Sequence, residues 1–402
     1  MSMTAGRNSS VLSRALLSCY SIMGLMCYPG QASAEDPWPW SGELAADSVT
    51  LLLLGDFNVQ QRENPADALV HVRQTLNQAD LVYANLEGLL VESKGPAWDL
   101  PNKNGWTHLG PDSVQALVAG NISIVGAANN VAFGRDSILD SLSVLDANGI
   151  AHTGAGSNLD EAHEPVIIEK KGVRFGFLQY TSKWYDEAEQ IATEDEAGVA
   201  RLKSPDGTSI EPADMERMLS DIRRLRPMVD ILVVSAHTRD GQGRSGSTSI
   251  PARRPSAGVE PDLYSRLPVN EGLQHLEPYQ QQVAHVAIDA GADVVFGHGC
   301  HMLQAVETYK DKPVMYCLGN FASDWIRVRD YRDGLVARIV VENRQLKRVS
   351  LVPVTRDAEN NNVRLVVPDS AEGRRLYGQL SELSESASLT LDGQELVLLE
   401  LP

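Results

Sequence analysis

Six residues of metal-binding type each follow closely on an apolar run that is typical of a buried strand. They are Asp56, Glu87, Asn130, His237, His298 and His301. Ligands of α/β sheets bind outside the carboxyl ends of the strands, so we expect these side chains to meet at one edge of a sheet. Mixed oxygen and nitrogen ligation suits Mn, Fe or Zn better than Ca, which prefers oxygen alone. The sequence therefore predicts a metal site.

Each of these residues alone also has an ordinary explanation. Asp56, directly after Gly55, could be a turn residue or a helix cap. His237 alone could be a hydrogen-bonded core histidine. The Gly-His-x-x-His pattern that contains His298 and His301 is a moderate signal by itself. Only the ordered combination favours metal binding.

The elements that must position these residues alternate between apolar runs and amphipathic segments, which indicates an α/β fold. Buried strands are expected at 49–54, 81–86, 122–127, 230–235 and 293–296. Helices are expected at 64–78, 111–119, 136–148, 212–225 and 277–290. Hairpins are expected where 165–169 meets 173–180, 306–309 meets 314–318, and 334–342 meets 346–353.

Three segments lack such a pattern. Residues 181–210 are acidic and irregular, which favours a surface excursion. Residues 238–270 form a long loop, and loops of this length are usually functional or disordered. The tail from residue 370 mixes a helix with a final strand near 396–401.

Composition limits the possible classes. The 402 residues are 43% hydrophobic and 22% charged, which is enough for a large core and excludes a collagenous, coiled-coil or disordered chain. The net charge of −18 argues against nucleic acid and anionic membrane surfaces as general partners.

Residues 1–34 have the pattern of a signal peptide. Arg7 and Arg14 form a positive region that precedes an apolar run over 15–27, and the Ala-Ser-Ala of 32–34 matches a cleavage site. The run is too short for a membrane-spanning helix, although an uncleaved N-terminal anchor is the alternative. We therefore expect export to the periplasm or the extracellular space.

Cleavage would leave two cysteines, Cys300 and Cys317. An exported protein could join them in one disulfide, and two unpaired buried thiols are the alternative. Their spacing is not that of a Cys-x-x-Cys metal site.

Taken together, the motifs resemble those of the bacterial capsule-synthesis family CapA, which is linked to poly-gamma-glutamate. The resemblance covers roughly residues 49–325 and is specific only as an ordered set. The matching stretches are Gly55-Asp56, 79–87, Ala128-Asn129-Asn130, Gly154-Ala155-Gly156, 291–304 and 316–321.

The resemblance implies a fold similar to that of calcineurin-like metallophosphoesterases, a layered α/β sandwich of two central mixed sheets flanked by helices. Residues 35–355 would form this domain. Residues 356–402 would form a small β-rich C-terminal extension packed on it.

The resemblance also implies two divalent metal ions. Glu87 would bridge them, Asp56 and His301 would complete one ion, and Asn130, His237 and His298 would complete the other. Asn130 and His237 are the residues expected to be catalytic. Residues expected to orient these ligands or to contact substrate are Asn85, Asn129, Asn320 and Arg239.

The chain departs from the family pattern at several positions. The family usually places a His after the paired Asn and an Asp three residues later, whereas Val131 and Gly134 stand here. In related phosphoesterases that His protonates the leaving group, so the general acid is missing from its usual place. Thr238-Arg239 and Gly299-Cys300 also replace family residues. Possible substitutes for the acid, each also explicable as a surface or turn residue, are His108, His152 and His163.

Two functions therefore compete. The first is an exported metal-dependent hydrolase-like enzyme that acts on a phosphoester or a poly-gamma-glutamate-type amide. The second is a non-catalytic accessory protein that binds an anionic extracellular polymer through its metal site. Either could work with membrane-associated capsule synthesis machinery. A purely structural secreted domain is a third reading, which the ordered ligand set disfavours.

Overall fold

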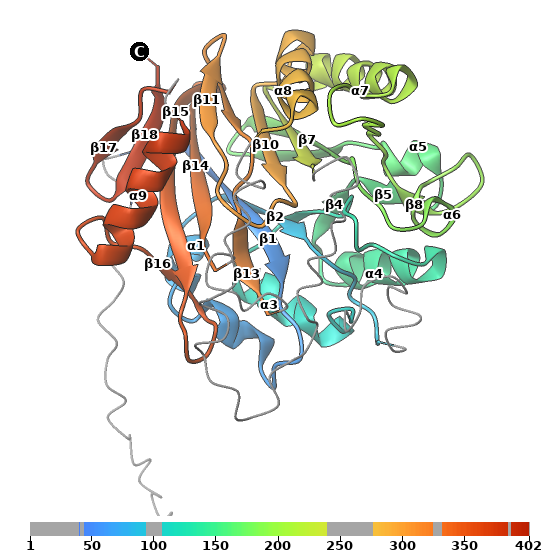
Figure 1. The fold of residues 1–402 in the computed structure, drawn as a ribbon, viewed down its shortest axis with the longest axis horizontal. Helices are drawn as coiled ribbons and strands as arrows, with labels where there is room; N and C mark the ends of the chain where they lie inside the picture. The colour runs from blue at the N-terminus through green and yellow to red at the C-terminus, as the bar shows by residue number, and fades with distance from the viewer. Residues whose placement is uncertain are drawn as a thin grey trace, which may run out of the picture. The chain divides into compact units, whose positions relative to one another are not determined.

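A computed structural model describes residues 40, 44–93, 107–238, 276–324, 332–384 and 387–401. Two mixed sheets form its centre (Figure 1). In the larger sheet, the main path of strands is β17-β18-β15-β14-β1-β2-β3-β4, with β13 beside β1 and β16 beside β15. These strands are β1 (Val49–Asn58), β2 (Leu81–Leu86), β3 (Ile124–Gly126), β4 (Ala151–Thr153), β13 (Asn320–Ser323), β14 (Gly334–Glu342), β15 (Gln345–Arg356), β16 (Val363–Leu365), β17 (Thr390–Asp392) and β18 (Glu395–Glu400).

The smaller sheet has the order β11-β12-β10-β9-β7-β6. Its strands are β6 (Val166–Lys170), β7 (Val173–Thr181), β9 (Ile231–His237), β10 (Val294–His298), β11 (Val306–Tyr309) and β12 (Lys312–Met315). Strands β7, β9, β10 and β12 run parallel, so β7, β9 and β10 end at the same edge. A separate short pair joins β5 (Ala155–Gly156) to β8 (Gly198–Val199).

The two sheets pack face to face, and the alternation of side chains along β1 shows how. Leu51 and Leu53 point into a core shared with Phe177 and Phe296 of the smaller sheet. The intervening Leu52 belongs to a second core on the opposite face. A third core lies between the smaller sheet and its own helices. The result is the layered α/β sandwich expected from the sequence.

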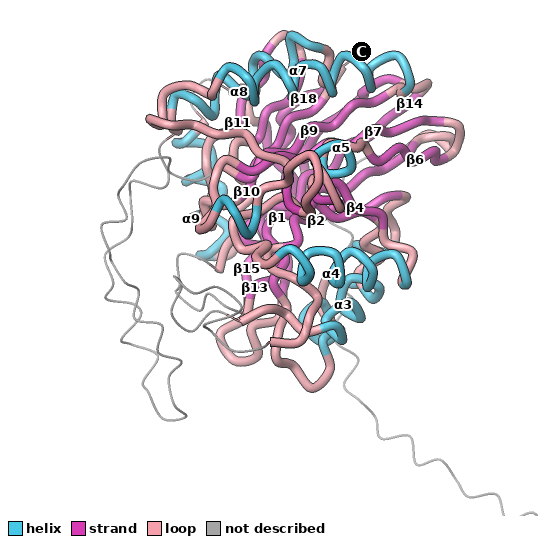
Figure 2. Tube along the Cα trace, turned by 90° about the vertical axis from the view of Figure 1, so that its right-hand side faces the viewer, coloured by secondary structure: helices cyan, strands magenta, loops and turns pink. Residues whose placement is uncertain are grey.

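Helices cover the outer faces of this sandwich. Figure 2 shows α7 and α8 on one side of the strands and α3 and α4 on the other. The helices are η1 (Pro65–Leu69), α1 (Arg73–Asn77), η2 (Pro111–Ser113), α3 (Val114–Ala119), α4 (Arg135–Ala147), α5 (Leu159–Ala162), α6 (Glu187–Gln190), α7 (Pro212–Leu225), η3 (Arg226–Met228), α8 (Pro278–Ala290) and α9 (Ala371–Leu383). No helix in the described part of the chain is long and apolar enough to cross a membrane.

Two sequence-based expectations were wrong. The helix expected over 64–78 is two short pieces, η1 and α1, separated by a stretch that contains the β-branched Val70 and Val72. The segment 181–210 is not a surface excursion, because Val199 and Leu202 are fully buried. Its apolar residues come singly or in pairs, such as Ile191-Ala192 and Val199-Ala200, and these show no regular period in the sequence.

Residues after β15 continue the larger sheet. The expected boundary at residue 355 falls inside β15, and β16 and β18 both pair with that strand. Leu376 and Leu380 of α9 are buried in the core between the sheets. The C-terminal segment therefore shares the sheet and the core of the main domain. The segments 1–34 and 239–270, including Arg239, lie outside the described residues.

Candidate metal centre

Strand pairing places predicted ligands at the carboxyl edges of the two sheets. In the larger sheet, Asp56 on β1 is the register partner of both Asn85 on β2 and Asn320 on β13. In the smaller sheet, His237 at the end of β9 is the partner of His298 at the end of β10. The two sheets thus bring their carboxyl edges together at these side chains.

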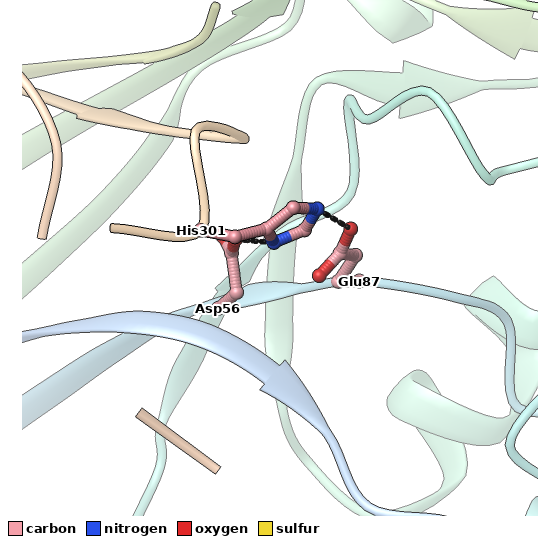
Figure 3. A group of neighbouring side chains, drawn as sticks. All are labelled: Asp56, Glu87 and His301. Carbon is pink, nitrogen blue, oxygen red and sulfur yellow. Dashed lines mark ion pairs between the residues drawn. The ribbon is translucent and has the colours of Figure 1, made fainter. Parts of the chain in front are cut away.

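Asp56, Glu87 and His301 form one compact group (Figure 3). His301 Nδ1 lies 3.1 Å from Asp56 Oδ2, and its Nε2 lies 3.4 Å from Glu87 Oε1. One ligand atom from each residue lies within 4.8 Å of the others. All three residues are buried. This group could hold a metal ion.

A second group adjoins the first. His237 Nε2 lies 3.0 Å from Asn130 Oδ1, and His298 Nδ1 lies 3.5 Å from Asp56 Oδ1. Asp56 therefore faces histidines of both groups. The structure thus brings all six predicted ligands into one connected set. Asn85 links the two groups, because its side chain contacts both Asp56 and His237.

The donor chemistry of this set fits metal ions. His298 Nε2 and Asn130 Nδ2 are buried and have no hydrogen-bond partner among the described residues, and His298 Nδ1 has only its long 3.5 Å contact with Asp56 there. An unsatisfied buried polar atom costs about 1–3 kcal/mol, so such atoms usually serve a ligand. Two atoms bound at right angles to one ion at about 2.1 Å lie about 3 Å apart, close to the spacings seen here.

Asp56 contributes a negative charge to the site. Burial alone would raise its pKa, but its contacts with His298 and His301 and the charge of those imidazoles hold the pKa well below the ordinary range. The side chain is therefore an ionised carboxylate, the form that binds a metal.

Asparagine and glutamine side chains hold the ligands in place. Asn85 Nδ2 donates to Asp56 Oδ1 at 2.9 Å and lies 3.4 Å from His237 Nδ1. Asn320 Oδ1 lies 3.1 Å from His301 Nδ1. These positions agree with the orienting roles expected for Asn85 and Asn320.

The remaining predicted asparagine, Asn129, shapes a turn. Its Oδ1 accepts from the N–H of Val131 at 3.0 Å, and its Nδ2 donates to the carbonyl of Leu86, next to Glu87. It ties the Asn130 turn to the end of β2. No contact of Asn129 with substrate is needed to explain its position.

Sequence reasoning missed Gln179. Its Nε2 donates to Asn85 Oδ1 at 2.8 Å, and its Oε1 accepts from the N–H of Ala128 at 2.7 Å. The side chain lies near the C-terminal end of β7 and is 1% exposed. A lone amide among the mostly apolar residues 175–180 was the signal that could have revealed it.

Val131 stands at the position where the family resemblance led us to expect a histidine. It is fully buried beside Phe133, and Tyr185 packs against the pair. Gln190 of α6 fixes the turn by donating from Nε2 to the carbonyls of Asn130 and Ala132, each at 2.9 Å. Val131 is therefore a packing residue in a well-braced turn.

The histidines considered as substitute acids are engaged elsewhere or buried. His163 Nδ1 lies 2.7 Å from Asp221 Oδ2, in a pair that is buried. His152 Nε2 lies 3.2 Å from Asp146 Oδ1. His108 is 4% exposed. Neither His108 nor His163 is a surface residue, although His163 does lie in the turn that ends α5, as the turn explanation expected.

Cys300 and Cys317 form a disulfide with Cα atoms 6.5 Å apart. This settles the alternative that the sequence left open. Cys300 directly precedes His301, and Cys317 stands three residues before Asn320. The bond therefore adjoins the metal-binding group.

The fold and the site define a layered α/β protein with a buried carboxylate–histidine centre at the carboxyl edges of its sheets. Residues 50–253 and 269–325, more than half of the chain, match the family described as bacterial capsule synthesis protein PGA_cap. The chain belongs to this family.

Individual relatives are distant. The chain is 24% identical over 347 residues to the capsule biosynthesis protein CapA of Bacillus anthracis, covering 81% of this chain and 75% of that protein. It is 23% identical over 383 residues to the PGA biosynthesis protein CapA of Bacillus subtilis, covering 93% and 88%. Among solved structures, a phosphatase of Mycoplasma pneumoniae aligns at 12% identity with a TM-score of 0.38, covering 79% of this chain and 90% of that one.

Proposed function

We propose that this protein is an exported metal-dependent hydrolase-like enzyme of capsule or polyglutamate synthesis. Two divalent ions of Mn, Fe or Zn would be held by the six clustered side chains. Glu87 would be shared, Asp56 and His301 would complete one ion, and the other would take Asn130, His237 and His298. When bound, such an ion pair supplies a clamp for a phosphoryl-like group and a hydroxide near neutral pH.

One observation carries this proposal. His298 is fully buried at the junction of the two sheets, and its Nε2 has no hydrogen-bond partner within the described residues. Its Nδ1 lies 3.5 Å from Oδ1 of the ionised Asp56, at the outer limit of a hydrogen bond, and Asp56 also contacts His301. A histidine that served only the core would usually have a well-satisfied ring nitrogen.

The substrate class follows from the family and the site. Homologues named for capsule or PGA biosynthesis point to an anionic polymer. A phosphoester or a poly-gamma-glutamate-type amide presents an oxygen that metal ions can polarise. Asn130 and His237, adjacent to each other, would border the reacting group, and Arg239 would bind a carboxylate or phosphate.

Val131 favours a second candidate function. Because valine cannot protonate a leaving group, the site could bind an anionic extracellular polymer without cleaving it. In this reading the protein is an accessory factor of membrane-associated synthesis machinery. The same ligands would then serve recognition alone.

Metal analysis of protein purified from its export compartment tests the centre. We expect about two metal ions per chain in the wild type and none in the His298→Ala/His301→Ala variant. The matched control is His152→Ala/His285→Ala, which removes two histidines that pair with Asp146 and Glu307, outside the ligand set. Full occupancy in the first variant would overturn the assignment.

Turnover of an aryl phosphate, measured beside binding of poly-gamma-glutamate, separates the two functions. Metal-dependent turnover supports the enzyme, and binding without turnover supports the accessory protein. Export is tested by mass spectrometry of the mature chain, which should begin at Glu35. An intact Met1 in a cytosolic protein would contradict export.

A further inference from the structure

A short segment before and at the start of β13, residues 317–320, contacts the backbone around two of the proposed ligands. The N–H of Leu318 donates to the carbonyl of Gly297, the residue before His298, at 3.1 Å. The carbonyl of Gly319 accepts from the N–H of Asp56 at 2.9 Å. The segment is thus hydrogen-bonded to both β10 and β1 and holds these two strands in position relative to each other at the metal centre.

The same segment reaches a third ligand through Asn320. Its Oδ1 lies 3.1 Å from His301 Nδ1, and its Nδ2 donates weakly to the carbonyl of His301 at 3.5 Å. The 317–320 segment therefore touches three separate ligand-bearing stretches of the chain.

The loop that carries His301 has a backbone that needs external support. His301 has a φ of +62°, and Gly299 has a φ of +89°. A non-glycine residue in the left-handed region is unfavourable and persists only where its surroundings over-determine it. Backbone contacts that link this loop to the 317–320 segment include an isolated β-bridge between Leu303 and Leu318. A long hydrogen bond of 3.4 Å also runs from the N–H of Gln304 to the carbonyl of Cys317.

The disulfide supplies the covalent tie between these two parts. Cys300 stands between His298 and His301, and Cys317 begins the 317–320 segment. Both cysteines are buried, at 3% and 0% exposed. The crosslink therefore joins the strained ligand loop to the segment that orients its neighbours.

We propose that the Cys300–Cys317 disulfide is a positioning element of the metal centre, so that the affinity for metal depends on the bond. This inference rests on the proposed metal-binding function. Losing the bond releases Cys300 from the 317–320 segment, and His301 then leaves its left-handed conformation more readily. Loss of groups that orient metal ligands typically lowers metal affinity about 10–100-fold, and we expect a decrease in this range.

The test compares Mn²⁺ affinity of the oxidised wild type with that of Cys300→Ala/Cys317→Ala, by competition with a chelator at a temperature where circular dichroism shows both folded. Mn²⁺ is chosen because thiolates bind it poorly, so reduced cysteines do not act as substitute ligands. The control is Leu225→Ala on α7, which removes a buried core side chain near Gly176, at the start of β7. We expect the control to keep wild-type affinity despite lower thermal stability.

A second arm serves if the alanine pair does not fold. A water-soluble phosphine and one water convert the disulfide to two thiols and a phosphine oxide, and alkylation of a separate aliquot confirms that two cysteines have become free. Reduced wild type should lose affinity to the same extent and regain it on reoxidation, which general destabilisation of the fold would not explain.

Three results would overturn the inference. Affinity within twofold of wild type, in the alanine pair or in the fully reduced protein, would show that the bond does not position the ligands. An equal loss in Leu225→Ala would show that affinity follows overall stability. An oxidised wild type that binds no metal would remove the proposed function and this inference together.

Discussion

Asn85 donates a hydrogen bond from Nδ2 to Oδ1 of Asp56, its register partner on the adjacent strand, at 2.9 Å. Gln179 holds the other end of the Asn85 amide by donating to its Oδ1 at 2.8 Å. This fixes which end of the amide faces the carboxylate. Asp56 is thereby locked in one orientation before any ligand binds, which lowers the cost of assembling the centre.

Replacing Asn85 with Ala should lower metal affinity about 10–100-fold, because an orienting partner of Asp56 and His237 is lost. Stability of the metal-free protein should fall by about 1–3 kcal/mol, since buried polar partners are left unsatisfied. Chelator competition and urea unfolding measure the two effects. Asn148→Ala, at an exposed side chain that bonds only to the carbonyl of Val144, is the matched control. Unchanged affinity in Asn85→Ala would show that Asp56 needs no such support.

Gly299→Ala should disrupt the centre by collision. A Cβ at this position would lie 2.7 Å from Nε2 of His237. The ring must therefore move away from Asn130, and metal content should fall sharply. Gly110→Ala separates strain from collision, because Gly110 has a nearly equal φ of +88° and no atom within 4 Å of the added Cβ. The control should lose about 1–3 kcal/mol of stability through backbone strain and keep its metal. Equal metal loss in both variants would contradict the argument.

The sequence predicted the strands and the edge at which the ligands meet, because the ligands stand at or within a few residues of the end of an apolar run. For β2, β9 and β10 such runs have few alternatives to a buried strand. Register then decides which side chains meet, and the Asp56–Asn85 and His237–His298 partnerships lie near the ends of neighbouring parallel strands.

The parts that escaped prediction depend on contacts between distant segments. Gln179 acts through Asn85, 94 positions away in sequence, and no local pattern pairs them. The burial of apolar residues in 181–210 depends on contacts such as the pairing of β8 with β5, which the local sequence pattern does not show. The disulfide was undecided because cysteine spacing says nothing of how close β10 and β13 come.

Removing metal should destabilise the wild type. A ligand that binds only the folded state at about 100 times its dissociation constant adds about 2.7 kcal/mol to the free energy of unfolding. Chelation should therefore lower Tm by several degrees, as differential scanning fluorimetry would show, and added Mn²⁺ should restore it. His298→Ala/His301→Ala should show no response to chelator. A wild-type Tm that is indifferent to chelator would contradict metal binding to the native state.

The valine at position 131 leads to a prediction about how the hydrolysis rate depends on the leaving group. A positioned general acid contributes about 10²–10⁴-fold to rate, and valine cannot donate a proton. Wild-type activity should therefore be weak on alkyl phosphoesters and biased towards acidic leaving groups such as nitrophenol. Rates across a series of leaving groups measure the bias as a steep dependence on leaving-group pKa.

Val131→His should flatten that dependence by raising the rate on poor leaving groups more than on good ones. The larger ring enters a fully buried position beside Phe133, so the variant should lose about 1–3 kcal/mol of stability. Val131→Leu overpacks the same site without a proton donor and should leave the slope unchanged. If Val131→His and Val131→Leu give the same slope, the pocket serves binding alone. High wild-type activity on alkyl esters would instead identify a different proton donor, because Val131 itself can supply none.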